Sequence, residues 1–345
     1  MPEYKLQCAV WEITLGCNLK CSHCGSSAGV PRNTELSKEE CYSLVEALAG
    51  LDCESVALMG GEPFLRNDWL SIAWCVKNLN MGLNIVSNGI LIPKHLDDLG
   101  RLEPDVVGLS LDGMETNHDK IRGKKGLFRR VINSIVKLRQ IGIQVTVITT
   151  ISTINFADLQ PMKDLLQSLG VNWQIQVAAP MGNFCGDLAI DLKQFYNTAV
   201  FLEKTYQKSF FYEFPVVGGH CFGYHSSVFP STSNWKGCTA GINSIGITSN
   251  GNIVGCLAMG NDRFIEGNVR EKPIQDIWND PNAFKYNRSF LKKDLGDICA
   301  QCEFGMECKG GCNAMSFAFT GKLHSDPYCY RRFEMKYLKS PNGKI

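Results

Sequence analysis

The sequence predicts an α/β fold, a partial (β/α)6 barrel followed by a small cysteine-rich C-terminal domain. Two observations predict it. Short β-like runs alternate with amphipathic helical stretches through the first part of the chain, which is typical of a parallel sheet with helices outside it. From Cys238 to Cys329, seven cysteines follow with few long periodic segments. We expect the barrel over residues 1–214, an irregular linker over 215–237 and the second domain over 238–335.

Six strands are expected, at residues 9–14, 55–59, 83–87, 106–111, 144–150 and 173–178. Between them lie helical patterns. One begins after Ser37, an N-cap with Glu40 in the capping-box position. The others cover residues 68–79, 128–141, 156–169 and 192–206. Six units make a partial, TIM-like barrel, in which the chemistry lies in loops at the carboxyl ends of the strands.

Composition excludes several classes of protein. A net charge of +1 over 345 residues does not indicate binding to nucleic acid. The chain has no run of about 18 apolar residues, and its first residues lack the pattern of a secretion signal. We therefore expect a cytoplasmic protein that binds neither nucleic acid nor membrane. Sixteen cysteines in that compartment indicate metal or cluster ligands rather than disulfides.

The most informative motif is CNLKCSHC, which holds Cys17, Cys21 and Cys24 directly after the first expected strand. Thiolates are ligands that suit iron–sulfur clusters and zinc. A four-iron cluster needs four ligands, so three cysteines would leave one iron open to a small molecule. Taken alone, the motif fits a zinc site, a ferredoxin-like fragment or a radical-initiating cluster.

The ends of the following strands carry groups that suit a small polar ligand. Gly60, Gly61 and Glu62 follow the second strand, where glycines allow close approach to a ligand and an oxygen can accept from an ammonium group. Ser87-Asn88-Gly89 ends the third strand and Ser110-Leu111-Asp112-Gly113 the fourth, and their hydroxyl and amide groups suit a ribose. The apolar run 147–151 could cover an adenine.

In this order and spacing, the four motifs resemble those of the radical S-adenosylmethionine (SAM) enzymes. The resemblance implies that SAM binds the open iron of a [4Fe-4S] cluster. The reduced cluster would then cleave SAM, and the resulting 5′-deoxyadenosyl radical would remove a hydrogen atom from the substrate. An electron donor such as ferredoxin or flavodoxin would reduce the cluster.

The same resemblance implies roles for residues around SAM. Gly60, Gly61 and Glu62 would hold the methionine amino end, and His23 stands where the family usually has an aromatic residue beside the adenine. The ribose or carboxylate candidates are Ser87, Asn88 and Ser110. Arg122 could pair with a carboxylate. Structural alternatives remain open: helix caps for the serines, stacking within the loop for His23 and an ion pair for Arg122.

The C-terminal cysteines form a second motif. Cys238, Gly251 and Cys256 are followed by the run Cys299-x2-Cys302-x5-Cys308-x3-Cys312 and by Cys329. This pattern resembles the SPASM domain, an extension of radical SAM enzymes that carries up to two auxiliary [4Fe-4S] clusters. The resemblance implies an outer cluster held by Cys299, Cys302, Cys308 and Cys329. It implies an inner cluster held by Cys238, Cys256 and Cys312, whose fourth iron is open or bound by Cys221. A double zinc site is the alternative.

Two further cysteines are candidates for chemistry. Cys185 follows the sixth expected strand and Cys221 lies in the linker. Either could donate a hydrogen atom to a substrate radical, ligate the inner cluster or have no role.

The resemblance implies a maturase that installs a crosslink, an epimerisation or a backbone excision in a ribosomally made peptide. Its partners would be the precursor peptide and, because the first strand begins so near the start of the chain, a separate leader-peptide recognition protein. The alternatives are a small-molecule or porphyrin-modifying radical SAM enzyme, a sulfatase-type protein maturase and an electron carrier without a substrate. An electron carrier needs no SAM pocket, so the motifs after the second, third and fourth strands argue against it.

Overall fold

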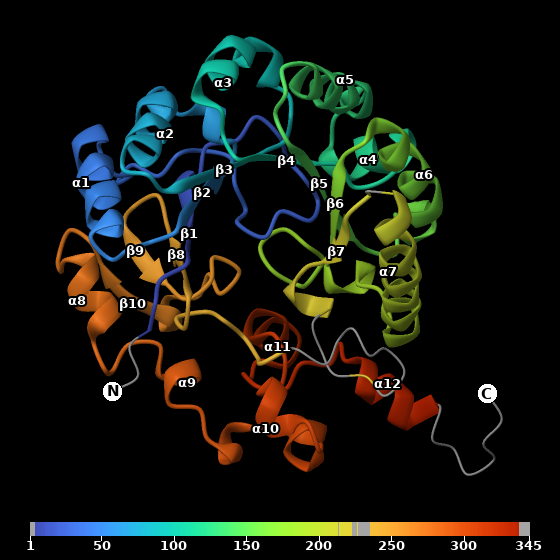
Figure 1. The fold of residues 1–345 in the computed structure, drawn as a ribbon. Coiled ribbons are helices and arrows are strands. Elements are labelled where there is room, and N and C mark those ends of the chain that lie inside the picture. The colour runs from blue at the N-terminus through green and yellow to red at the C-terminus, as the bar shows by residue number, and fades with distance from the viewer. Residues whose placement is uncertain (1–3, 213, 223–225, 227–234, 338–345) are drawn as a thin grey trace.

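The computed structural model describes residues 4–212, 214–222, 226 and 235–337. It confirms the α/β fold with a parallel sheet (Figure 1). The six expected strands form one parallel series in chain order. They are β1 (Cys8–Thr14), β2 (Ser55–Gly60), β3 (Gly82–Ser87), β4 (Val106–Ser110), β5 (Val145–Ile151) and β6 (Asn172–Val177).

Helices cover the outer side of this curved sheet (Figure 1). They are α1 (Lys38–Ala49), α2 (Trp69–Asn78), α3 (Leu96–Leu102), α4 (Glu115–Arg122), α5 (Leu127–Gln140), α6 (Leu159–Leu169) and α7 (Leu192–Tyr212). The expected capping box at Ser37 and Glu40 is present. The sequence patterns did not predict α3 and α4, because each is short and α4 buries only His118 and Ile121.

The two faces of the strands differ in burial. Along β5, the buried Val145, Val147, Thr149 and Ile151 alternate with half-buried residues such as Thr150, as the pleat of a strand requires. In β6 the same alternation buries Trp173 and leaves Gln176 half-buried. In β5 and β6, one face of the strand therefore packs in the core and the other is less tightly covered.

The sheet continues beyond the six expected strands on both sides. β7 (Val216–Gly218) lies in the expected linker and pairs in parallel with β6. β8 (Ser244–Ile247) pairs in parallel with β1 on the opposite side, and β9 (Asn252–Val254) and β10 (Ile265–Asn268) extend that side as antiparallel strands. The sheet order is β10-β9-β8-β1-β2-β3-β4-β5-β6-β7. The segment with the C-terminal cysteines is thus joined to the barrel through β8.

Five short α-helices follow β10 along the rest of the described chain (Figure 1). They are α8 (Ile274–Asn279), α9 (Lys285–Arg288), α10 (Gly305–Cys308), α11 (Asn313–Thr320) and α12 (Tyr330–Tyr337). Within the described part of the chain, none of the helices has the length and apolar character needed to cross a membrane.

Candidate active site and cluster-binding cysteines

The CNLKCSHC loop lies at the carboxyl end of β1. The loop is closed at its base, where the Cys17 amide donates to the Gly29 carbonyl at 2.9 Å and the Gly29 amide donates to the Leu15 carbonyl at 3.0 Å. Its middle is docked on α4, because the Ser22 amide donates to the Ile121 carbonyl at 2.9 Å. The loop is therefore held at both its base and its middle.

The three thiols of this loop suit a cluster. Burial raises the pKa of Cys17 and of Cys21, and the other thiols of the trio raise the Cys17 pKa further, since they would repel its thiolate. Two donors offset such negative charge: Arg122 Nη1 lies 3.8 Å from Cys21 Sγ, and the Ala28 amide donates to Cys24 Sγ at 3.3 Å. Hydrogen bonds of this kind orient and tune thiolate ligands. The loop thus fits the [4Fe-4S] cluster that the sequence predicts.

A buried network behind the loop contains Asp112, which was not among the predicted site residues. Asp112 Oδ2 accepts from Arg122 Nε at 2.5 Å and lies 2.9 Å from His23 Nε2. Burial alone would raise the Asp112 pKa, but the Arg122 and His23 charges outweigh it and the pKa is lowered. Arg122 and Asp112 therefore form an ion pair, the alternative role that the sequence left open for Arg122.

His23 keeps one polar atom free in this network. Its side chain is 8% exposed, and its Nδ1 is buried with no hydrogen-bond partner among the described residues. That nitrogen is available to a ligand. The expected place beside an adenine stays a prediction.

The glycines after β2 allow two backbone segments to meet. A Cβ on Gly60 would lie 2.2 Å from the Thr14 carbonyl oxygen, and one on Gly61 would lie 2.2 Å from that of Gly16. The Gly61 and Glu62 amides donate to these same two oxygens at 2.8 Å. The close approach in the structure is therefore to the start of the first cysteine loop, and it fixes the end of β2 against that loop.

Glu62 is fully buried and its carboxylate is used inside the protein. Oε1 accepts from the Ser87 hydroxyl at 2.9 Å, and Oε2 accepts from the Asn88 amide at 2.9 Å. Burial raises the pKa of Glu62 to about 7, against the opposing effect of these hydrogen bonds. In this structure Glu62 links the ends of β2 and β3, so its carboxylate positions two loops. Binding of a methionine amino group by the Gly60–Glu62 segment stays a prediction.

Ser87 and Asn88 also serve the loop after β3. The Ser87 hydroxyl accepts from the Gly89 amide at 3.0 Å, and the Asn88 side-chain amide donates to Asn18 in the first cysteine loop at 2.8 Å. Ser110, by contrast, is half-buried at the end of β4. All three lie at the carboxyl ends of their strands, where the sequence placed them.

The outer set of cysteines lines one cavity. Cys299, Cys302, Cys308 and Cys329 all contribute to its wall. Asp326 lines the same cavity, and its Oδ2 accepts from the amide of Cys312 at 3.2 Å. The structure therefore gathers these four thiols as the sequence predicts, with a buried carboxylate between them and Cys312.

The inner set of cysteines is also brought together. Burial raises the pKa of Cys312 and of Cys256, and the Cys238 thiol raises both further, as only a near neighbour can. Around no single point in the described part of the chain do three His, Cys, Asp or Glu side chains converge to hold one metal ion. Three neighbouring thiols of this kind are ligands that suit an iron–sulfur cluster.

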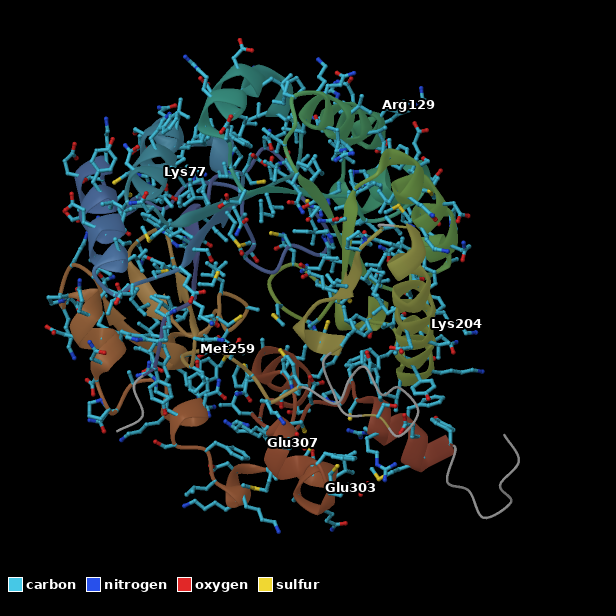
Figure 2. The ribbon with its side chains drawn as sticks, in the orientation of Figure 1. Lys77, Arg129, Lys204, Met259, Glu303 and Glu307 are labelled. Atoms are coloured by element: carbon cyan, nitrogen blue, oxygen red, sulfur yellow. The ribbon has the colours of Figure 1, made fainter. Side chains whose placement is uncertain are left out.

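The loop after β6 connects the first cysteine loop to the inner set. The Asn183 amide donates to the Cys24 carbonyl at 2.9 Å. On the other side, Met181 packs with Cys256 and Cys312 against a small buried group that includes Met259. Figure 2 shows Met259 toward the middle of the molecule and Glu303 and Glu307 at its lower edge. The sequence did not predict this contact, because it depends on the close packing of Gly182 against the Cys24 carbonyl and not on a sequence motif.

The two additional cysteines differ in exposure. Cys185, in the same loop after β6, is exposed. Cys221 is buried in the core, where its Sγ accepts from the Val177 amide at 3.4 Å and burial raises its pKa to about 12. A role in hydrogen donation or cluster binding stays a prediction for both.

The chain matches the model of the Radical SAM superfamily over residues 11–166 and that of the SPASM iron–sulfur cluster-binding domain over residues 238–303. It is 30% identical to Fe-coproporphyrin III synthase of Methanosarcina barkeri, over 93% of this chain and 87% of that protein. It is 28% identical to mycofactocin maturase MftC of Mycolicibacterium smegmatis, over 91% and 79%. Its fold is similar to that of Streptococcus suis SuiB bound to S-adenosylmethionine, with a TM-score of 0.74 at 18% identity over 90% of this chain and 74% of that one.

Fold and site together define an enzyme that cleaves SAM reductively at an iron–sulfur cluster. The chain belongs to the radical SAM superfamily and carries a C-terminal SPASM domain. Its cofactors are SAM, the [4Fe-4S] cluster that binds it and the auxiliary clusters that a SPASM domain implies.

Proposed function

We propose that the enzyme installs a radical-based modification, namely a crosslink, an epimerisation or a backbone excision, in a ribosomally made peptide. The supporting observation is the polarity of the barrel at the carboxyl ends of its strands. Thr150 and Gln176 present a hydroxyl and an amide there, joined by a 2.9 Å hydrogen bond. Arg122 is already paired with Asp112. Neutral donors and acceptors suit the amide groups of a peptide backbone.

The chain's own residues would set up the reaction. When bound, the cluster and SAM supply the radical that takes a hydrogen atom from the substrate. Cys17, Cys21 and Cys24 would hold that cluster, with Arg122 beside Cys21. The loop after β6 would lie between this site and the inner set, since it donates to the Cys24 carbonyl and packs on the same buried group as Cys256 and Cys312. A substrate in the barrel would then lie between a radical source and an electron carrier.

The precursor would be presented by a separate leader-peptide recognition protein. Peptide binding has been seen in a protein of similar fold, SuiB bound to its precursor peptide SuiA. Titration of the precursor into the enzyme, with and without the recognition protein, tests this partner. Sub-micromolar binding of the precursor by the enzyme alone would contradict it.

A porphyrin is the second candidate substrate. The observation that favours it is the 30% identity to Fe-coproporphyrin III synthase over most of both chains. Porphyrin carboxylates need cations, and Lys20 in the first cysteine loop is an exposed one. We place the porphyrin second because Arg122 is already paired with Asp112, which occupies its charge, and so it is less suited to bind a porphyrin carboxylate.

One anaerobic experiment separates the two. The reduced enzyme and SAM are incubated in heavy water with a candidate precursor peptide and, separately, with an iron porphyrin that carries more carboxylate side chains than iron coproporphyrin III, the product that the relative's name gives. We expect 5′-deoxyadenosine formation coupled to a peptide change: deuterium at an α-carbon for epimerisation, loss of two hydrogens for a crosslink, or loss of a backbone fragment for excision. Loss of carbon dioxide from the porphyrin with an unchanged peptide would overturn the proposal. A Cys21→Ala variant, which lacks one cluster ligand, is the control for both arms.

A further inference from the structure

The inner set has three cysteines, and the hydroxyl of Tyr286 points into the same region. Tyr286 precedes Asn287 in α9, a short helix far from the cysteines in sequence. Its Oη is buried and has no hydrogen-bond partner among the residues that the structure describes. A buried hydroxyl without a hydrogen-bond partner is destabilising, so its presence needs a reason.

The hydroxyl lies directly against the residue before Cys256. A Cβ built on Gly255 would be 1.9 Å from Tyr286 Oη. A glycine at this position therefore makes room for the hydroxyl beside a cysteine of the inner set. Tyr286, Cys256 and Cys312 also pack against the same small buried group of Met259, Phe264 and Ala314.

Buried hydrogen bonds fix α9 to the rest of the inner set. The Asn287 side-chain amide donates to the Ala240 carbonyl at 2.7 Å, two residues after Cys238. The Asn313 amide, directly after Cys312, donates to Asn287 Oδ1 at 2.8 Å. Together with the Gly255 contact, this helix is tied to a neighbour of each inner cysteine.

The Tyr286 main chain and ring are held as well. His324 Nε2 lies 2.8 Å from the Tyr286 carbonyl oxygen, and the ring of Phe264 packs edge-on against the Tyr286 ring with centroids 6.0 Å apart. The direction of the hydroxyl is therefore set by its surroundings rather than by a hydrogen bond of its own.

We propose that the Tyr286 hydroxyl donates a hydrogen bond to the inner auxiliary cluster and makes that cluster easier to reduce. The sulfurs of a cluster are the acceptors that the unpartnered hydroxyl lacks. Hydrogen bonds to these sulfurs stabilise the added negative charge of the reduced state and so raise the reduction potential. The proposal rests on the SPASM assignment and is independent of whether the substrate is a peptide or a porphyrin.

The test is the Tyr286→Phe variant of the full, cluster-loaded enzyme. Phe keeps the ring packing on Phe264 and removes only the hydroxyl. We expect unchanged iron and sulfide content and an inner cluster whose one-electron reduction becomes about tenfold less favourable, a shift of about −59 mV. Redox titration followed by electron paramagnetic resonance measures this shift, and the outer cluster in the same sample should keep its potential.

A second variant moves the hydroxyl instead of removing it. Gly255→Ala places a methyl group where Tyr286 Oη lies, so the same negative shift is expected, and combining it with Tyr286→Phe should add little further. Tyr330→Phe is the matched control. Its hydroxyl is buried beside outer-set Cys329 but donates to the Phe222 carbonyl at 2.9 Å, so the inner potential should not move.

Two outcomes would overturn the proposal. One is an inner-cluster potential in Tyr286→Phe equal to that of the unmodified enzyme. The other is loss of the inner cluster's iron with the outer cluster intact, which would make Tyr286 a ligand rather than a hydrogen-bond donor.

Discussion

Glu62, which follows Gly60 and Gly61 at the end of β2, has structural contacts that its sequence motif did not predict. A carboxylate at the end of a barrel strand is expected to face a ligand. Here it accepts hydrogen bonds from Ser87 and Asn88 and is fully buried. The end of β2 is thereby fixed to the end of β3, so the site's shape depends on this carboxylate.

The pH dependence of stability follows from the same residue. Burial raises the Glu62 pKa to about 7, above its value in the unfolded chain. The folded state therefore binds the proton more tightly, and the stability from this group is full below the unfolded pKa and is lost as the pH rises through about 7. As the pH rises from about 5 to about 8, we expect the titration of Glu62 to reduce the free energy of unfolding by up to about 3 kcal/mol. Anaerobic denaturant unfolding of the native enzyme and of Glu62→Gln measures the difference, since the variant lacks this titration.

Glu40→Gln is the control for that measurement. The Glu40 pKa is lowered to about 2, chiefly by its hydrogen bond from Arg270, so Glu40 is ionised throughout this range and its removal should leave the pH profile unchanged. A Glu62→Gln profile parallel to that of the native enzyme would contradict the raised pKa.

At the scale of elements, the loop after β6 is the connection between the first cysteine loop and the inner set. Gly182 adopts a φ of +56°, and a Cβ there would lie 2.2 Å from the Cys24 carbonyl oxygen. Only glycine tolerates both the left-handed conformation and this contact without strain. The loop thus touches the backbone of a cluster ligand directly.

The Gly182→Ala variant tests this contact. The methyl group should push the Cys24 carbonyl away and strain the loop by about 1–2 kcal/mol from the left-handed backbone alone. We expect loss of iron from the first cluster and a SAM cleavage rate reduced by about tenfold or more. Iron analysis and 5′-deoxyadenosine formation measure both.

Gly186→Ala in the same loop is the matched control, because a Cβ there meets only Pro180 at an ordinary 3.7 Å. It should retain iron and activity. If Gly182→Ala behaves like this control, the loop does not position the cluster ligand.

The elements differ in how well local sequence signals define them. The capping box at Ser37 and Glu40 and the strand β5 are defined by local sequence, and both were predicted. The spacing of Cys17, Cys21 and Cys24 indicated the first site for the same reason. Asp112 and Tyr286 could not be assigned to their sites, because each depends on contacts between segments distant in the sequence.

At the scale of the whole molecule, the barrel and the SPASM domain share one sheet. β8 pairs in parallel with β1 in the register Ala9 to Ile245 and Trp11 to Ile247. No local pattern predicts pairing between strands so far apart. The sequence therefore indicated a barrel and a second domain but did not predict that they share a sheet. Since β1 leads directly into the first cysteine loop, the C-terminal segment supports the strand that carries this site.

The Ile247→Ala variant tests whether the two parts are one cooperative unit. Ile247 is fully buried, and shortening it should cost about 2–5 kcal/mol. If β8 and β1 open together, amide hydrogen exchange should accelerate by the same factor in both strands and in the loop from Cys17 to Gly29. Leu291→Ala, at a position 54% exposed, is the control and should change exchange little. Faster exchange confined to β8, with β1 and its loop still fully protected, would show instead that the barrel holds its active site without the C-terminal domain.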